Sequence, residues 1–401
     1  MLIELIIALI CGVSAGTLTG ILPGIHINLI GSILISASVG TLINISPIYL
    51  IVFIVAMSVV HTFIDFIPSI YLGAPQDGTE LSILPGHELL KKGKAHEAVL
   101  ITLLGSLIAI FLICFLSPLL IFTIPKLNSL IKPIIPFLLI TISVFLVFQE
   151  KNKIFSALIV FLLAGILGLI TLNLELKEPL LPLLTGLFGA SSLIISIKQK
   201  TQIPKQKIST IKEIRLTKKD IISSGILSTF FSSVLGFLPA IGSGQIAVIS
   251  STFKKINNKQ FLFSLGLINP FMMILSFLTI YTIGKGRTGS AVFIGEILGK
   301  ISIEQIILIL FVSLISGVIA FIIGIKLSKL FAKNIGKINY SKVSIFVLFF
   351  LLIIVTIFSG FLGTIIFIIS TATGIYCIQS TVRRIQMMGC LLLPTIFLYL
   401  F

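Results

Sequence analysis

The sequence predicts an all-α integral membrane protein, with about 14 transmembrane helices in two inverted-topology repeats whose helices are broken by glycine and proline. Three observations favour this fold class. Apolar residues make up 57% of the 401 residues and charged residues only 10%, whereas a soluble globular chain is roughly a quarter charged. Long apolar stretches follow one another with short connections. Short motifs of the first half also recur in the second half.

Hydropathy places seven predicted spans in each half of the chain. The first-half spans lie near 2–20, 26–43, 48–70, 96–122, 128–148, 153–173 and 178–197. The second-half spans lie near 221–238, 244–253, 261–283, 302–330, 343–359, 361–380 and 385–401. The stretch at 288–299 is too short to cross a bilayer, so we expect it to belong to a re-entrant element. The predicted organisation is a first repeat at 1–197, a basic cytoplasmic linker at 198–219 and a second repeat at 220–401.

Two motif pairs indicate that the halves arose by duplication. GILPGI at 20–25 recurs as GFLPAI at 236–241. GHELLKKGKAHEAVLI, which starts at Gly86, matches GEILGKISIEQIILIL, which starts at Gly295. One such match is weak in so apolar a chain, but two in the same order point to an internal repeat.

The basic residues predict how the two repeats are oriented. Clusters of lysine and arginine all fall on one side of the predicted membrane, at 91–94, 151–153, 198–219, 254–259, 326–342 and 383–384. By the positive-inside rule this side is the cytoplasm. Because each half contains an odd number of spans, the second half inserts upside down relative to the first. Both termini are then expected near the outer face.

Glycine and proline interrupt four segments at corresponding places in the two halves, at 20–28, 73–87, 236–245 and 284–290. Backbone groups released from a helix are costly in lipid unless they line a cavity or meet protein. Paired interruptions therefore point to a binding site near the bilayer centre, where helix N-termini attract anions. The competing interpretation is that these residues only kink or pack helices. The backbone positions concerned are Gly20, Pro23, Gly24, Gly236, Pro239, Gly242 and Gly244.

The polar residues within these breaks are the candidate site residues. We predict substrate contacts from His26, Asn28, Ser243, Gln245, Lys285, Arg287, Thr288 and Ser290. Acidic residues in the first half stand near the positions of bases in the second half, which suits a carrier that holds an anion and a coupling cation together. The predicted coupling-ion residues are Asp77, Thr79, Glu80, His61 and Asp65. Alternatively, Lys285 and Arg287 are water-facing loop charges, and His61 with Asp65 is a structural pair.

The sequence contains no motif of a metal site or of an enzyme. It has no HExxH, no metal-spaced Cys/His set and no GxxxxGK[ST]. We therefore predict no enzymatic activity and no cofactor other than Na⁺ or H⁺ as the coupling ion. The basic residues that give the net charge of +16 lie between apolar segments. This placement indicates topology signals and contact with anionic lipid headgroups, not with nucleic acid. His87 and His96 lie near a basic turn and are expected to be solvated.

The break motifs resemble those of a known family, the large membrane subunit (TctA-like permease) of the tripartite tricarboxylate transporters. Gly20 to Gly24 match the family's Gly-Leu-Leu-Pro-Gly motif. GHELLKKGKA, at 86–95, matches its most specific block with His87 in place of a tyrosine. LPAIGSG, at 238–244, matches a second-half motif with Ala240 in place of a glycine.

This resemblance implies uptake of carboxylate anions by ion-gradient coupling, together with a periplasmic substrate-binding protein and a small membrane subunit. The chain departs from the family at GAPQDGTELSILP, which replaces a Gly-Gly-Ser-rich stretch. It is also shorter than typical members, and the alternative for such a divergent branch is transport without a binding protein. The family's substrate preference therefore does not carry over to this chain.

We interpret the chain as a secondary transporter, or permease, that moves an organic anion, a carboxylate, across the cell membrane. One alternative is a polyprenyl-phosphate (lipid carrier) translocase, which should show a lipid-facing opening beside a basic pocket. A carrier of soluble anions should instead show a water-accessible pocket closed to lipid. A further alternative is a non-transporting membrane enzyme or scaffold, which should show convergent catalytic groups.

Overall fold

The computed structural model describes residues 2–22, 46–74, 79–199, 203–214, 216–254, 256–337 and 340–400, without the side chain of Leu84. Within these ranges the regular structure is helical throughout. Eight helical stretches there are long and apolar enough to cross a membrane. The predicted all-α, multi-pass integral membrane protein is thus confirmed. The total of 14 spans remains a prediction.

In the described residues, ten helical elements and two connecting helical turns build the first half. The ten elements are α1 (Leu2–Ile21), α3 (Pro47–Ile64), α4 (Phe66–Leu72), the 3₁₀ turn η1 (Glu80–Ser82), α5 (Ile83–Lys91), α6 (Ala95–Ile131), α7 (Ile135–Phe148), α8 (Ile154–Asn173), α9 (Leu180–Leu184) and α10 (Ser191–Lys198). The 3₁₀ turn η2 (Lys132–Ile134) joins α6 to α7, and the π-helical turn η3 (Thr185–Ala190) joins α9 to α10.

The second half follows the linker with a similar succession. Its elements are α11 (Lys218–Leu235), α12 (Ser243–Phe253), α13 (Asn258–Ile283), α14 (Gly289–Leu298), α15 (Ile303–Ile335), α16 (Tyr340–Gln379), the 3₁₀ turn η5 (Arg384–Met388) and α17 (Gly389–Leu400). α14 has 10 residues, which is too short to span and agrees with the expected re-entrant element.

α16 is two helices joined by a sharp reversal. Gly360 has φ 66° and ψ −164°, which is outside the helical region and in the left-handed half of φ space that favours glycine. The Oγ1 atoms of Thr356 and Thr364 lie 3.0 Å apart, whereas eight residues of straight helix would separate them by about 12 Å. The chain therefore folds back at Gly360, at the boundary predicted between 343–359 and 361–380.

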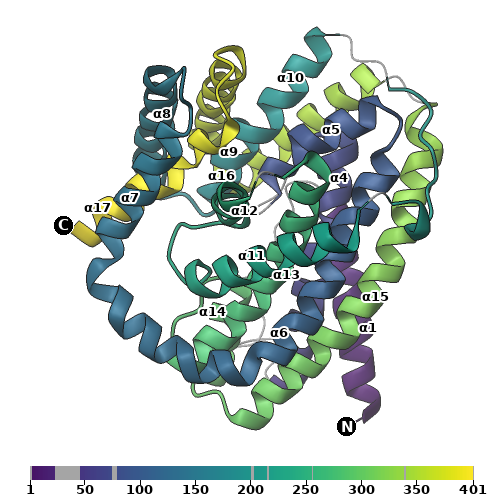
Figure 1. Cartoon of the computed structure of the whole chain (residues 1–401), viewed down its shortest axis with the longest axis vertical. Coiled ribbons are helices and arrows are strands. Elements are labelled where there is room, and N and C mark those ends of the chain that lie inside the picture. Colours follow the sequence, from purple (N-terminus) through teal and green to yellow (C-terminus); the bar gives the residue numbers. More distant parts are fainter. Residues whose placement is uncertain are drawn as a thin grey trace.

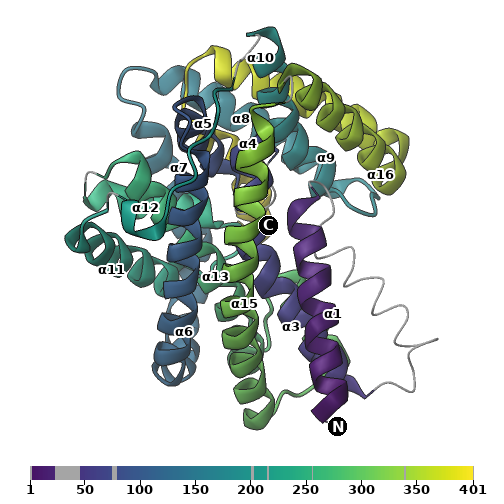
Figure 2. The same cartoon turned by 90° about the vertical axis from the view of Figure 1, so that its right-hand side faces the viewer.

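The helices form two groups, which Figures 1 and 2 show from two sides. The core bundle contains α1, α3–α6 and α11–α15, and the side bundle contains α7–α10, α16 and α17. In both views the N-terminus lies at the end of the molecule opposite to α5 and α10. The most buried spans are Pro47–Leu72 and Asn258–Ile283, so α3, α4 and α13 form the centre of the core bundle.

Close backbone contact joins the halves within the core bundle. α6 packs along α13, and α15 packs along α3. A Cβ added at Gly266 of α13 would lie 2.2 Å from the carbonyl oxygen of Thr102 on α6, so only glycine permits this approach. Ser106 Oγ adds a 2.8 Å hydrogen bond to the carbonyl of Gly266. Small residues at such crossings are a common means of holding helices together in lipid.

The expected division between 96–122 and 128–148 was wrong in its position. α6 continues as one helix from Ala95 to Ile131 through Pro118 and Pro125, and η2 follows it directly. Pro118 cannot donate to the carbonyl of Cys114, but Ser117 Oγ donates to that carbonyl instead, at 2.8 Å. Side-chain replacement of the lost bond lets the helix pass the proline in an apolar setting.

Candidate functional site

The first-half break folds the chain back against its own helix. α4 ends at Gly73, whose φ is 67°, and η1 and α5 then begin at Glu80 and Ile83. Ser69 Oγ donates to the carbonyl of Thr79 at 3.2 Å and lies 2.7 Å from Ser82 Oγ. The last turn of α4 therefore holds the start of the returning segment.

The second-half break repeats this arrangement at matching positions. α13 ends at Gly284, whose φ is 66°, and α14 starts at Gly289. Ser276 Oγ, two turns before the end of α13, accepts hydrogen bonds from the backbone N–H groups of Arg287 (2.8 Å) and Thr288 (2.9 Å). This hydroxyl satisfies two donors that would otherwise lack partners where the helix is broken.

A third break separates α11 from α12 and closes a helical hairpin. Gln245 Oε1 accepts from the N–H of Gly242 at 2.8 Å, and Gln245 Nε2 donates to the carbonyl of Ala240 at 3.3 Å. At the other end of the hairpin, Lys254 Nζ donates to Ser223 Oγ at 2.5 Å. Gln245 is fully buried, so its first role is to cap the broken backbone.

The breaks contact one another both within the second half and between the halves. Arg287 Nη1 donates to the carbonyl of Gly236, at the tip of the α11–α12 hairpin. A Cβ added at Gly244 would lie 2.9 Å from Leu81 Cδ1, so α12 of the second half touches the start of the returning segment of the first half. The breaks therefore meet protein and one another.

Two polar contacts join the centres of the halves. Asn269 Nδ2 of α13 donates to Oδ2 of the fully buried Asp65 at 3.1 Å. Ser58 Oγ of α3 donates to Ser290 Oγ of α14 at 2.6 Å. Since buried polar groups in lipid need partners, these contacts fix the register of one half against the other.

A pocket of about 740 Å³ lies beside the breaks, between the core bundle and the turns of the side bundle. Its volume falls within the range of small-molecule sites. Its core-bundle wall comes from α5, α12 and the start of α13, and its other wall from the turns at 149–151 and 383–385. Both turns carry basic residues predicted to be cytoplasmic. Leu81 and Glu80 line the pocket, so it reaches the first-half break.

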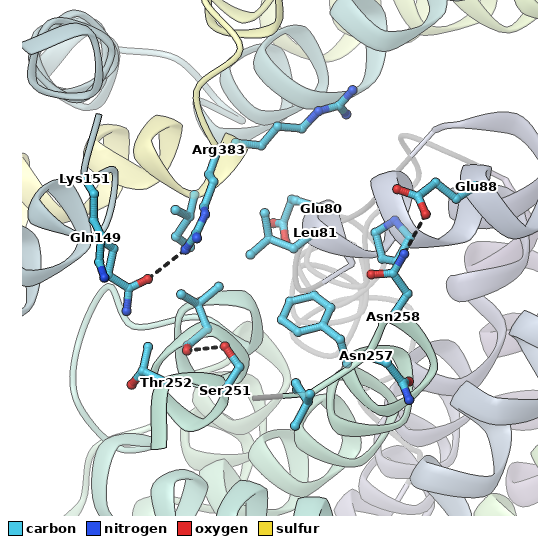
Figure 3. A pocket seen from close by; sticks show the side chains of 16 residues that line it. Glu80, Leu81, Glu88, Gln149, Lys151, Ser251, Thr252, Asn257, Asn258 and Arg383 are labelled. Atoms are coloured by element: carbon cyan, nitrogen blue, oxygen red, sulfur yellow. Dashed lines mark hydrogen bonds between the residues drawn. The ribbon is translucent and has the colours of Figure 1, made fainter. Parts of the chain in front are cut away.

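Charged and amide groups face this pocket from both walls (Figure 3). Arg383 Nη1 donates to Gln149 Oε1 at 3.0 Å, and Arg383 Nε lies 3.6 Å from Glu150 Oε1. Across the pocket, Asn258 Nδ2 donates to Glu88 Oε2 at 2.6 Å. Polar side chains thus line the pocket from the basic turns to the first-half break.

The predicted substrate residues are placed in different surroundings. The region where the Gly/Pro breaks contact one another, the break layer, buries Ser243, Gln245 and Ser290. Arg287 and Thr288 are partly buried, and Lys285 is exposed. His26 and Asn28, with Pro23 and Gly24, lie outside the described residues. None of the predicted substrate contacts among the described residues lines the pocket itself.

The predicted coupling-ion residues are buried near the first-half break. Thr79 and Glu80 are 0% and 1% exposed, and Glu80 also lines the pocket. His61 Nδ1 lies 2.9 Å from Thr19 Oγ1 of α1, and Asp65 binds Asn269 as above. Asp77 lies outside the described residues. The described residues contain no cluster of three metal-ligating side chains.

The expectation that His87 and His96 are solvated was wrong. His96 is 2% exposed, and its Nδ1 lies 2.9 Å from Ser328 Oγ of α15. His87 Nε2 lies 3.4 Å from the hydroxyl of Tyr340. Burial, together with the positive charges of Arg384 and Lys91, lowers the pKa of His87 to about 3. The side bundle and α15 cover both rings, and a linear hydropathy profile contains no signal for such coverage.

Sequence analysis missed most of the pocket wall. The additional polar residues are Gln149, Ser251, Thr252, Asn257, Asn258 and Arg384. The sequence indicates Arg383 and Arg384 only as a topology signal. Basic residues between two predicted spans look the same in the local sequence whether they line a pocket or lie in a surface turn.

Comparison with known proteins gives a coherent result. The family described as "Tripartite tricarboxylate transporter TctA family" matches residues 6–389. The chain is 33% identical over 409 aligned positions to an uncharacterized protein of Methanocaldococcus jannaschii, and the alignment covers 98% of each chain. No solved structure matches the chain.

Lys285 and Arg287 allow a matched test of the second-half break. We expect Arg287→Ala to weaken the apparent affinity for citrate uptake into proteoliposomes by about 2–5 kcal/mol, because a partly buried guanidinium within hydrogen-bonded surroundings is lost. Arg287→Lys should also impair uptake, since an ammonium lacks the planar fork. The exposed Lys285 is the control, and Lys285→Ala should change the affinity by well under about 1 kcal/mol. Near-normal uptake by Arg287→Ala would remove this residue from anion handling.

Proposed function

The chain belongs to the tripartite tricarboxylate transporter TctA family, and from this premise we propose that it is a secondary transporter that moves a small organic anion, a carboxylate, across the cell membrane by coupling to an ion gradient. Membership in a transporter family favours transport over enzymatic activity. The observation that carries the proposal is the pocket, because it combines a volume suited to a small molecule with polar walls and direct access to a helix break.

The first-half break is the proposed site of ion coupling. Glu80 is buried and faces the pocket that an anion would enter, so a bound Na⁺ or H⁺ at this carboxylate would offset the charge of the substrate. Thr79 directly precedes Glu80 in the returning segment, and Asp65 directly precedes α4, whose last turn holds that segment. His61 and Asp77 complete the proposed set. The second-half residues Ser243, Gln245, Arg287, Thr288 and Ser290, with His26 and Asn28, remain the proposed contacts of the anion at the break layer.

The family name also implies partner subunits. We propose that the chain works with a small membrane subunit and a substrate-binding protein. The binding protein would deliver the anion on the outer side, opposite to the basic turns. The pocket beside those turns would then be the exit toward the cytoplasm.

Transport through such a chain is easiest to explain with inverted-topology repeats at 1–197 and 220–401, joined by the linker at 198–219. Three features support this proposal: both returning segments follow a left-handed glycine, Gly73 or Gly284; a serine of the preceding helix holds each one; and α6 packs on α13 as α15 packs on α3. An alternating-access change would then exchange the conformations of the two repeats.

A polyprenyl-phosphate translocase is the second candidate. An apolar groove of about 420 Å³ lies between α6 and α11, and its described lining, from Leu112 to Val234, contains no charged residue. Such a groove suits a lipid chain but is not basic, as lipid-phosphate recognition would require. We therefore retain the soluble anion as the main proposal.

Reconstitution into liposomes tests the transport proposal directly. We expect an imposed Na⁺ or pH gradient to drive citrate uptake, and Glu80→Gln to abolish most of the gradient dependence while changing citrate binding less than about threefold. Glu88→Gln is the matched control, since Glu88 lines the same pocket but is exposed and bonded to Asn258. An unchanged gradient dependence in Glu80→Gln would exclude Glu80 from coupling. Movement of a polyprenyl phosphate without any carboxylate uptake would favour the translocase.

Single-cysteine labelling tests the inverted arrangement, after replacement of Cys11, Cys114, Cys377 and Cys390. Lys207→Cys, in the linker, should react with a membrane-impermeant maleimide only from the cytoplasmic side. Lys285→Cys should react only from the outer side, because the second-half break is predicted to face outward. Labelling of both positions from the same side would contradict the inverted repeats.

A further inference from the structure

Two neighbouring arginines of the pocket wall differ in their partners. Arg383 is paired with Glu150 and hydrogen-bonded to Gln149, and its side chain is 59% exposed. Arg384 has no carboxylate within 4 Å among the described residues. Its hydrogen bond there runs from Nη1 to Ser192 Oγ, at 2.6 Å. The charge of Arg383 is thus offset by the protein, and that of Arg384 is not.

The surroundings of Arg384 withdraw it from bulk water. It is partly buried, and Ser192 on α10 is 6% exposed. Partial burial of a cation is unfavourable unless an anion or further hydrogen bonds accompany it. A guanidinium has five N–H donors, and Ser192 accepts from Nη1 only. Arg384 also lines the pocket, so a ligand there is within reach of donors that the described protein leaves unused.

The rest of the pocket suits an elongated polar anion. Ser251, Thr252, Asn257 and Asn258 line the wall formed by α12 and the start of α13. These neutral groups do not compete for the guanidinium as a carboxylate would, and Glu88 on the same wall accepts a hydrogen bond from Asn258. The charge of Arg384 helps to lower the pKa of His87 to about 3, so this imidazole stays neutral. Lys151 also lines the pocket but is exposed, so among the described residues Arg384 is the partly buried cation of this wall that lacks a carboxylate within 4 Å.

We propose that Arg384 anchors a carboxylate or phosphate group of the transported molecule in the pocket, through the planar fork of its guanidinium. Arg383, held by Glu150, shapes the same wall but does not bind the anion. This inference rests on the proposed function in that it takes the pocket as the path of an anion. It adds a binding residue outside the Gly/Pro breaks, on the side bundle.

A binding measurement on the purified full chain in detergent separates this role from a structural one. The probes are citrate, inorganic phosphate and a polyprenyl phosphate, measured by calorimetry at constant ionic strength. We expect Arg384→Gln to weaken the binding of citrate by at least about tenfold, as the loss of hydrogen bonds to a charged group implies. Arg384→Lys should also bind more weakly than the wild type. The matched control, Arg383→Gln, should stay within about twofold.

Ser192→Ala keeps the test decisive if Arg384→Gln is unstable. This variant removes the tie between η5 and α10 but leaves the guanidinium in place, so citrate affinity should stay within about threefold of the wild type. A loss in Ser192→Ala as large as in Arg384→Gln would assign Arg384 a packing role and overturn the proposal.

The remaining outcomes separate the anion site from transport. If Arg384→Gln bound citrate and phosphate as tightly as the wild type does, the proposed site would be overturned, even if gradient-driven uptake is observed. The site would also be overturned if the wild type bound none of the three probes. Arg384-dependent binding without uptake would support the site and contradict the transporter. Arg384-dependent binding of the polyprenyl phosphate alone would support the site and identify a lipid headgroup as the source of the anionic group.

Discussion

The need of every backbone polar group for a partner inside the bilayer is the constraint on which this structure depends. A helix broken within lipid exposes N–H and C=O groups that water cannot satisfy. The protein meets this requirement with serine and glutamine side chains, as Ser276 does for two N–H groups and Gln245 does for Gly242 and Ala240. It also brings the breaks together, since Arg287 of one break binds the carbonyl of Gly236 in another. Each break is thus satisfied by protein, and the first-half break borders the pocket through Glu80 and Leu81.

Sequence reasoning predicted the features that depend on local composition. The membrane class, the positions of the breaks at 73–87, 236–245 and 284–290, and the reversal at Gly360 follow from hydropathy and from glycine and proline, because lipid and backbone geometry constrain them residue by residue. The continuity of α6 was not predictable in this way, since it depends on one hydroxyl of Ser117 that replaces a lost backbone bond. The burial of His96 depends on Ser328, more than two hundred residues away. The pocket wall was missed for the same reason: Arg383 and Arg384 are adjacent in sequence but differ in their long-range partners.

The two bundles have separate parts in the proposed mechanism. The core bundle supplies the breaks, with the acidic Glu80 in the first half and the basic Arg287 in the second. The side bundle supplies cationic turns that face the break region across the pocket. A coupled carrier must bind and release its anion and its coupling ion in the same conformational change. If the two bind on facing walls of the pocket, one relative movement of the bundles can bind or release both. In the proposed mechanism, substrate release is linked to the same contacts that keep the broken backbone satisfied.

The contact between Leu81 and Gly244 offers the most direct test of a shared break layer. A Cβ at Gly244 would lie 3.8 Å from the Cβ of Leu81, which is the usual separation across a disulfide. In a variant without its native cysteines, Leu81→Cys and Gly244→Cys should form a disulfide with mild oxidant in membranes. The cross-linked protein should lose gradient-driven citrate uptake and regain it on reduction, because the two breaks must move apart for transport. Failure to form the disulfide, or normal uptake with the disulfide intact, would contradict the account.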